Sequence, residues 1–108
     1  MGLINSSIRV AMLLSQKLDL EYKIMLVTQA EMNLSQSVSD LMQVGSDYTD
    51  PDSLVVKQLK QREQRLQQLE KKLQLQQKQY QVRLEMINQE LESAKKMRDE
   101  AIQNVFKY

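Results

Sequence analysis

The side chains that most often carry enzyme chemistry are scarce in this sequence of 108 residues. It contains no His and no Cys, which excludes imidazole and thiolate catalysis, disulfide bonds and the usual zinc ligand sets. Glu85, Glu90 and Glu92 could be taken as a carboxylate pair of the glycosidase kind, but on a long polar helix such residues are typical of a solvated face. No Ser, Lys or Tyr stands in a constellation that would activate a nucleophile. We therefore expect no enzymatic activity and no cofactor.

Asp47, Asp50 and Asp52 are the residues best suited to bind a metal ion. Their spacing lacks the alternate-residue ligands, the central Gly and the closing Glu of an EF-hand calcium loop. Asp is also common in turns and at helix N-caps. We interpret the three aspartates as turn and capping residues, and predict no metal site.

The elements that would position these residues follow from where Gly and Pro occur. The sequence has two Gly and one Pro, too few for the turns of an all-β fold. Residues 3–44 and 54–108 contain neither, whereas residues 45–53 hold one Gly, the Pro and three Asp. This pattern predicts an all-α chain: a two-helix antiparallel hairpin with coiled-coil character, forming a single domain over residues 1–108.

The turn supplies the expected helix boundaries. Gly45 suits the left-handed position that closes a helix, so the first helix is expected over about residues 3–44. Asp50 and Pro51 suit an N-cap and a first helical residue, which would start the second helix near residue 51 and extend it to about 106. If all of residues 45–53 form the turn, the second helix covers about 54–108.

The apolar residues of the second helix follow one seam in alternating steps of three and four. Val55 would open this seam, Arg62 and Gln76 would fill its gaps, and the step from Tyr80 to Leu84 is one residue too long, which predicts a stutter in the supercoil. The predicted intra-hairpin seam is Leu59, Leu66, Leu69, Leu73, Tyr80, Leu84, Ile87 and Leu91.

The first helix has two apolar stripes, and a single partner helix can cover only one narrow face. The first stripe contains Ile4, Ile8, Ala11, Leu18, Tyr22, Met25 and Met32. The surplus apolar surface predicts self-association, because monomers seldom expose so large a patch. The residues expected to mediate it are Ile4, Ile8, Val10, Leu14, Leu20, Ile24, Val27, Leu34, Val38 and Leu41.

Charge is segregated along the chain, although the net charge is only +1. Residues 57–83 carry eight basic side chains against Glu63 and Glu70, and are rich in Gln. Because no aromatic residues for base stacking are interleaved with them and the chain is nearly neutral, we expect no nucleic acid as a partner. The residues of this candidate lumen or polar face are Lys57, Lys60, Arg65, Lys71, Lys72, Lys78 and Arg83.

No run of apolar residues approaches the roughly 20 needed to cross a bilayer, and no cleavable signal peptide is evident. Gly2 and Ser6 match the short N-myristoylation pattern. Because this pattern fixes only two positions, sequences often match it by chance. Residues 3–14 also fit, weakly, a helix that lies on a membrane surface.

The turn with Asp50 and Pro51 and the C-terminal residues resemble type III secretion needle subunits, which are small helical hairpins. The apolar first helix also resembles the terminal helices of flagellin-type filament proteins. The C-terminal residues that carry the resemblance are Ala101, Ile102, Gln103, Asn104 and Phe106. It implies export, secretion-apparatus proteins as partners, polymerisation into a hollow helical tube as an extracellular appendage, and a lumen lined by the second helix.

These observations predict a structural subunit whose main partner is itself, in a homo-oligomer, filament or tube. The alternative is a coiled-coil chaperone or adaptor that forms a discrete small oligomer and uses the first helix to hold clients. In that case, a cytoplasmic location is expected.

Overall fold

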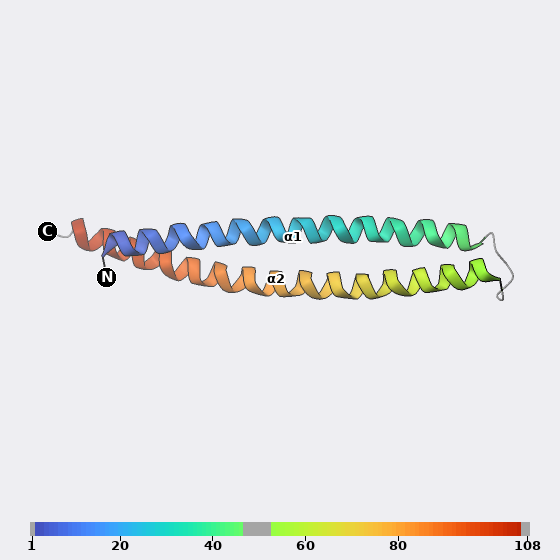
Figure 1. Cartoon of the computed structure of the whole chain (residues 1–108). Coiled ribbons are helices and arrows are strands. Elements are labelled where there is room, and N and C mark those ends of the chain that lie inside the picture. The colour runs from blue at the N-terminus through green and yellow to red at the C-terminus, as the bar shows by residue number, and fades with distance from the viewer. Residues whose placement is uncertain (1, 47–52, 107–108) are drawn as a thin grey trace. The chain divides into compact units, whose positions relative to one another are not determined.

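The computed structural model describes residues 2–46 and 53–106 of the chain. Within them there are two helices, α1 (Leu3–Ser46) and α2 (Leu54–Phe106), and no strands. The two helices form an antiparallel hairpin (Figure 1), so the predicted all-α fold class is confirmed. The long Gly- and Pro-free segments are the local cause, because residues such as Leu, Gln, Lys and Glu favour the helix and nothing interrupts its hydrogen bonds.

The last turn of α1 differs from the prediction. Gly45 has no positive φ and lies inside the helix, so it is not the left-handed closing residue and α1 ends two residues later than residue 44. The hydroxyl of Ser46 instead donates a hydrogen bond of 2.7 Å to the carbonyl of Gln43. This bond satisfies one of the carbonyl groups that a helix end leaves without a partner, and Gly45 can then keep ordinary helical geometry.

The cap of α2 is Ser53. Its hydroxyl accepts a hydrogen bond from the backbone N–H of Val56 at 3.2 Å, and its carbonyl accepts one from the N–H of Lys57. This is the N-cap arrangement expected of Ser. In the described residues α2 therefore begins at Leu54, three residues after the earlier of the two expected starts. Asp50 and Pro51 lie outside the described residues, as do the calcium candidates Asp47 and Asp52.

The hairpin divides into two compact units, each made of one segment from each helix. Unit 1 contains residues 1–24 and 79–108, and unit 2 contains residues 25–78. In unit 1 the beginning of α1 lies beside the end of α2 (Figure 1). The prediction of a single domain over the whole chain stays a prediction.

The best-packed part of unit 1 is a cluster of four buried side chains, Val10 and Leu13 from α1 and Leu91 and Ala94 from α2. Ile87 packs against them. Ala94 is only 1% exposed, the lowest value in the described residues. A methyl group at this position leaves room for the side chains of α1, so the two helices can approach each other closely.

Unit 2 is less completely packed. Its buried residues are Val27 and Leu34, both on α1, and the inward side chains of its α2 segment are only half-buried. Thr28 and Gln77 connect the two helices through a side-chain hydrogen bond. The antiparallel pairing in this unit therefore combines a thin apolar seam with polar contacts.

Candidate self-association interface

The residues of α1 that face α2 recur in alternating steps of three and four, the spacing of a coiled-coil seam. All of them are buried or half-buried. In unit 1 they are Leu3, Ser6, Val10, Leu13, Lys17, Leu20 and Ile24. In unit 2 they are Val27, Glu31, Leu34, Val38, Leu41 and Gly45.

Most residues predicted to mediate self-association belong to this inward seam. Val10, Leu20, Val27 and Leu34 are between 4% and 8% exposed. The half-buried members are Ile24, Val38 and Leu41. Because α2 covers their side chains, these seven residues are not available to a second copy while the hairpin is intact. Of the predicted set, Ile4, Ile8 and Leu14 are exposed. The outward side of α1 therefore has only Ile4, Ile8 and Leu14 in common with the predicted set.

In unit 1 the outward side of α1 is the first stripe found in the sequence. We define the outer face of unit 1 as Ile4, Ile8, Ala11, Met12, Leu18 and Tyr22. The five large side chains among them are 54% to 74% exposed. None of the six is charged. Of the nearby charges on α1, Asp19 pairs with Lys23 (3.0 Å) and Glu21 with Lys17 (4.0 Å), whereas Arg9 forms no ion pair with another described residue. The result is an apolar surface with no partner inside the hairpin.

Of the eight residues predicted for the seam of α2, seven are buried or half-buried and one is exposed. The side chains that are half-buried or buried as predicted are Leu59, Leu66, Leu73, Tyr80, Leu84, Ile87 and Leu91. Leu69 is 45% exposed, and Val55, which was expected to open the seam, is 41% exposed. Val56, Glu63 and Gln77 are half-buried, each one residue after a predicted seam or gap position, Val55, Arg62 and Gln76.

This change removes the predicted stutter. With Val56, Glu63 and Gln77 inward and the exposed Glu70 at the position between Leu66 and Leu73, the steps of three and four continue to Tyr80 and Leu84. A stutter would locally unwind the supercoil and turn the seam away from its partner helix. The unbroken spacing keeps one face of α2 against α1, at the cost of placing polar side chains in the seam of unit 2.

Sequence reasoning missed two charged residues in the seam of α1, Lys17 and Glu31. Both are half-buried, and one carboxylate oxygen of Glu31 is buried without a hydrogen-bond partner among the described residues. Lys17 and Glu31 are fourteen residues, or two heptads, apart, and this spacing could have identified them as seam positions from the sequence. A charge at a seam position lowers stability but restricts register and partner choice.

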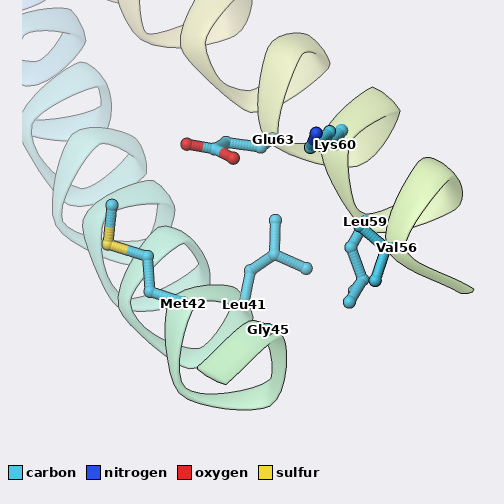
Figure 2. Close-up of a pocket in the computed structure, with 7 residues that line it drawn as sticks. All are labelled: Leu41, Met42, Gly45, Val56, Leu59, Lys60 and Glu63. Carbon is cyan, nitrogen blue, oxygen red and sulfur yellow. The ribbon is translucent and has the colours of Figure 1, made fainter. Parts of the chain in front are cut away.

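The described part of unit 2 has an apolar hollow of about 260 Å³ between the end of α1 and the start of α2. Figure 2 shows Leu41 of α1 and Val56 and Leu59 of α2 projecting toward it, with the carboxylate of Glu63 extending across one side. The hollow has room for one or two side chains. It lacks the convergent polar groups that orient a small-molecule substrate.

All seven residues of the candidate lumen or polar face are exposed. Six of them belong to the α2 segment of unit 2, and Arg83 belongs to unit 1. None takes part in an ion pair with another described residue. The carboxylates once considered for catalysis, Glu85, Glu90 and Glu92, are exposed as well.

Residues 2–46 and 53–106 hold no group of three His, Cys, Asp or Glu side chains placed to bind a metal ion. Neither α1 nor α2 is long and apolar enough to cross a membrane. No protein family, no curated protein and no solved structure matches the chain. The resemblance to secretion needle subunits therefore stays a prediction. Of the residues that carry it, Ala101 and Ile102 are half-buried, and Gln103, Asn104 and Phe106 are exposed.

Proposed function

We propose that this protein is a structural, non-enzymatic subunit that assembles with copies of itself through the outer face of unit 1. The observation that carries the proposal is that α1 presents Ile4, Ile8, Met12, Leu18 and Tyr22 to solvent while its other apolar side is already packed on α2. A helix of a monomeric soluble protein normally has one apolar stripe and one polar side.

The size of the outer face supports an interface between copies. With roughly 100 Å² of exposed surface for each of its five large side chains, the face offers about 500 Å² of mainly apolar area, against the roughly 800 Å² per partner of a standard interface. Flanking residues such as Leu14 would supply much of the remainder, because this side chain is 39% exposed. Met25 and Met32 continue the same spacing along α1 and are exposed in unit 2.

We further propose that the assembly is a helical filament or tube, a secretion-needle-like appendage by resemblance. The outer face supports a contact between two copies, which is only part of what a filament requires. If two outer faces pack against each other with twofold symmetry, the contact closes and gives a dimer. A filament needs a contact between two different surfaces of the subunit, so that each copy leaves one of them free for the next.

The alternative function, a chaperone or adaptor that holds client helices, is favoured by one specific observation. Four of the exposed side chains of α1 are methionines: Met12, Met25, Met32 and Met42. Met is flexible and polarizable, and surfaces that bind varied helical partners use it often. In this case the protein would form a discrete small oligomer, and the outer face would bind a client instead of another copy.

The test compares two double variants of the full chain with matched exposure. Ile8→Lys with Leu18→Lys places two charges on the outer face, where the native side chains are 54% and 65% exposed. Val82→Lys with Met86→Lys makes the same change on α2 of the same unit, where the native side chains are 52% and 56% exposed. Circular dichroism establishes that both variants keep their helices, and light scattering and negative-stain microscopy measure assembly.

We expect the wild type and the α2 variant to form oligomers at tens of micromolar, and the outer-face variant to stay monomeric with unchanged helicity. Polymers in the micrographs would support the filament, whereas a single small stoichiometry would support the discrete oligomer. A wild-type chain that stays monomeric at this concentration contradicts self-association, and equal assembly of the two variants places the interface elsewhere.

A further inference from the structure

The outward side of α2 in unit 2 carries a row of cations. In the seam spacing, Lys57, Lys71 and Lys78 come one residue after a seam position, and Arg65 and Lys72 come two residues after one; the seam position before Lys71 and Lys72 is the exposed Glu70. In the heptad repeat these positions lie on the solvent side of the helix, on either side of the outermost position, which Gln61, Gln68 and Leu75 occupy. We call these five residues the basic face. All five are exposed.

No residue of the basic face forms an ion pair with another described residue, although Glu70 is exposed immediately before Lys71. The α2 segment of unit 2 has two acids, Glu63 and Glu70. Glu63 is half-buried on the seam side, and Glu70 accepts a hydrogen bond from Gln74 at 3.5 Å. None of the ion pairs in the described part of the chain involves a residue of unit 2. The basic face is therefore a surface of local net positive charge on a nearly neutral protein.

The residues between the cations indicate what kind of polyanion fits. They include Gln58, Gln61, Gln64 and Gln68, all exposed, whose side-chain amides can donate hydrogen bonds to phosphate oxygens. The exposed apolar side chains of the α2 segment in unit 2 are Leu54, Val55, Leu69 and Leu75, of which only Leu75 lies among the cations on the outward side, and no aromatic residue occurs between residues 57 and 78. The face therefore lacks the apolar surface that inserts into a bilayer and the rings that stack on single-stranded bases.

The dimensions also fit a double helix. The basic face extends over about 32 Å at 1.5 Å per residue, with cations on a straight and narrow rod. A duplex carries one negative charge per roughly 1.7 Å of axis, and its major groove is about 12 Å wide, which admits an α-helix. We infer that the basic face binds the phosphate backbone of double-helical nucleic acid, without reading its sequence.

This inference reverses the expectation drawn from the sequence. The expectation weighed the net charge of +1 and the absence of stacking aromatics. The structure places five of the seven cations of residues 57–78 on the solvent side of α2, whereas Lys60 and Arg62 line hollows shared with α1. Screening limits the effect of more distant acids to about 8–10 Å at moderate salt. Binding of a duplex to this face does not require two copies of the chain.

The experiment measures the affinity of the full chain for a fluorescently labelled DNA duplex by anisotropy at several salt concentrations. We expect dissociation constants in the range of roughly 10⁻⁶ to 10⁻⁴ M. The logarithm of the association constant should fall with the logarithm of the salt concentration with a slope of about −3 to −4.5, because each neutralised phosphate contributes about −0.9. Two duplexes of unrelated sequence should bind equally.

The basic-face variant combines Lys57→Gln, Arg65→Gln, Lys71→Gln, Lys72→Gln and Lys78→Gln. Gln is a good helix former and already abundant in α2, so the hairpin should persist. The control removes the same number of charges from unit 1 with Arg9→Gln, Lys23→Gln, Arg83→Gln, Lys95→Gln and Lys96→Gln. We expect the basic-face variant to lose at least about tenfold in affinity and most of its salt dependence, and the control to lose less than threefold.

Three results would overturn the assignment. One is the absence of saturable duplex binding at 50 mM salt, and another is an equal loss in the two variants. The third is tighter binding to phosphatidylserine vesicles or to poly-glutamate than to the duplex, because the partner would then be a membrane or an acidic protein.

Discussion

Thr28 of α1 and Gln77 of α2 lie within hydrogen-bond distance across unit 2, although they are 49 positions apart in the sequence. The hydroxyl oxygen of Thr28 is 3.3 Å from Nε2 of Gln77 and 3.4 Å from Oε1. An apolar seam with heptad spacing tolerates a slip of one heptad, because leucines then still meet leucines. The Thr28–Gln77 bond adds a small preference for the observed register, small because exposed polar groups can bond to water in another alignment.

A double-mutant cycle would measure the coupling between Thr28 and Gln77. We expect Thr28→Ala and Gln77→Ala each to lower the free energy of unfolding by about 0.5 kcal/mol, with a coupling energy of similar size, since the bond is solvent-exposed. Urea unfolding monitored by circular dichroism at one protein concentration is the measurement. The neighbouring exposed Gln29→Ala combined with Gln77→Ala should be additive, and coupling as large in this control pair would contradict a specific Thr28–Gln77 contact.

Replacement of Glu31 should stabilise the hairpin. Glu31→Leu removes a carboxylate with one buried oxygen that has no hydrogen-bond partner among the described residues, and extends the apolar seam between Val27 and Leu34. We expect a gain of about 1 kcal/mol in the free energy of unfolding. The exposed Glu85→Leu is the control and should change stability by less than about 0.5 kcal/mol. A loss of stability in Glu31→Leu would show that the carboxylate makes a favourable interaction in the seam.

The cap of α2 can be tested at Ser53. Ser53→Ala removes the hydroxyl that accepts the N–H of Val56, and should cost about 1 kcal/mol of stability. Ser53→Asp should retain most of it, because a carboxylate caps the same N–H group. Ser35→Ala, at an exposed position inside α1, is the control and should be neutral or slightly stabilising. Thermal unfolding distinguishes these outcomes. Equal melting temperatures for Ser53→Ala and wild type would place the start of α2 elsewhere.

Stability should fall both when a side chain of the buried cluster in unit 1 is made smaller and when one is made larger. Leu91→Ala leaves a cavity and should cost about 2–4 kcal/mol, while Ala94→Leu overpacks the closest part of the helix pair and should cost about 1–3 kcal/mol. Met86→Ala, at a position 56% exposed in the same unit, should change the free energy of unfolding by less than about 0.5 kcal/mol. If Ala94→Leu were as stable as wild type, the helices could not be as close at this position as the burial of Ala94 indicates.

Sequence patterns were sufficient to predict the two helices, but not to predict which side of each helix packs against the other. The segments without Gly or Pro predicted two helices with nearly correct ends, because helix propensity and chain punctuation act locally. The prediction failed at Gly45 because Gly permits a left-handed closing residue but does not require one. For α2, Val55 and Leu69 were placed in the seam because they are apolar, with Arg62 and Gln76 filling its gaps, whereas Val56, Glu63 and Gln77 are half-buried in the structure.

The sequence by itself determined that the chain is all-α, where it turns, and that α1 has more apolar surface than one helix can cover. Only the tertiary structure decided which side of α1 packs on α2, placing Val10 and Leu20 inside and Ile8 and Leu18 outside. The physical reason is that a helix with two apolar stripes has two sides of similar hydrophobicity. The choice between them depends on how side chains of the second helix, such as Ala94 and Leu91, fit against each side.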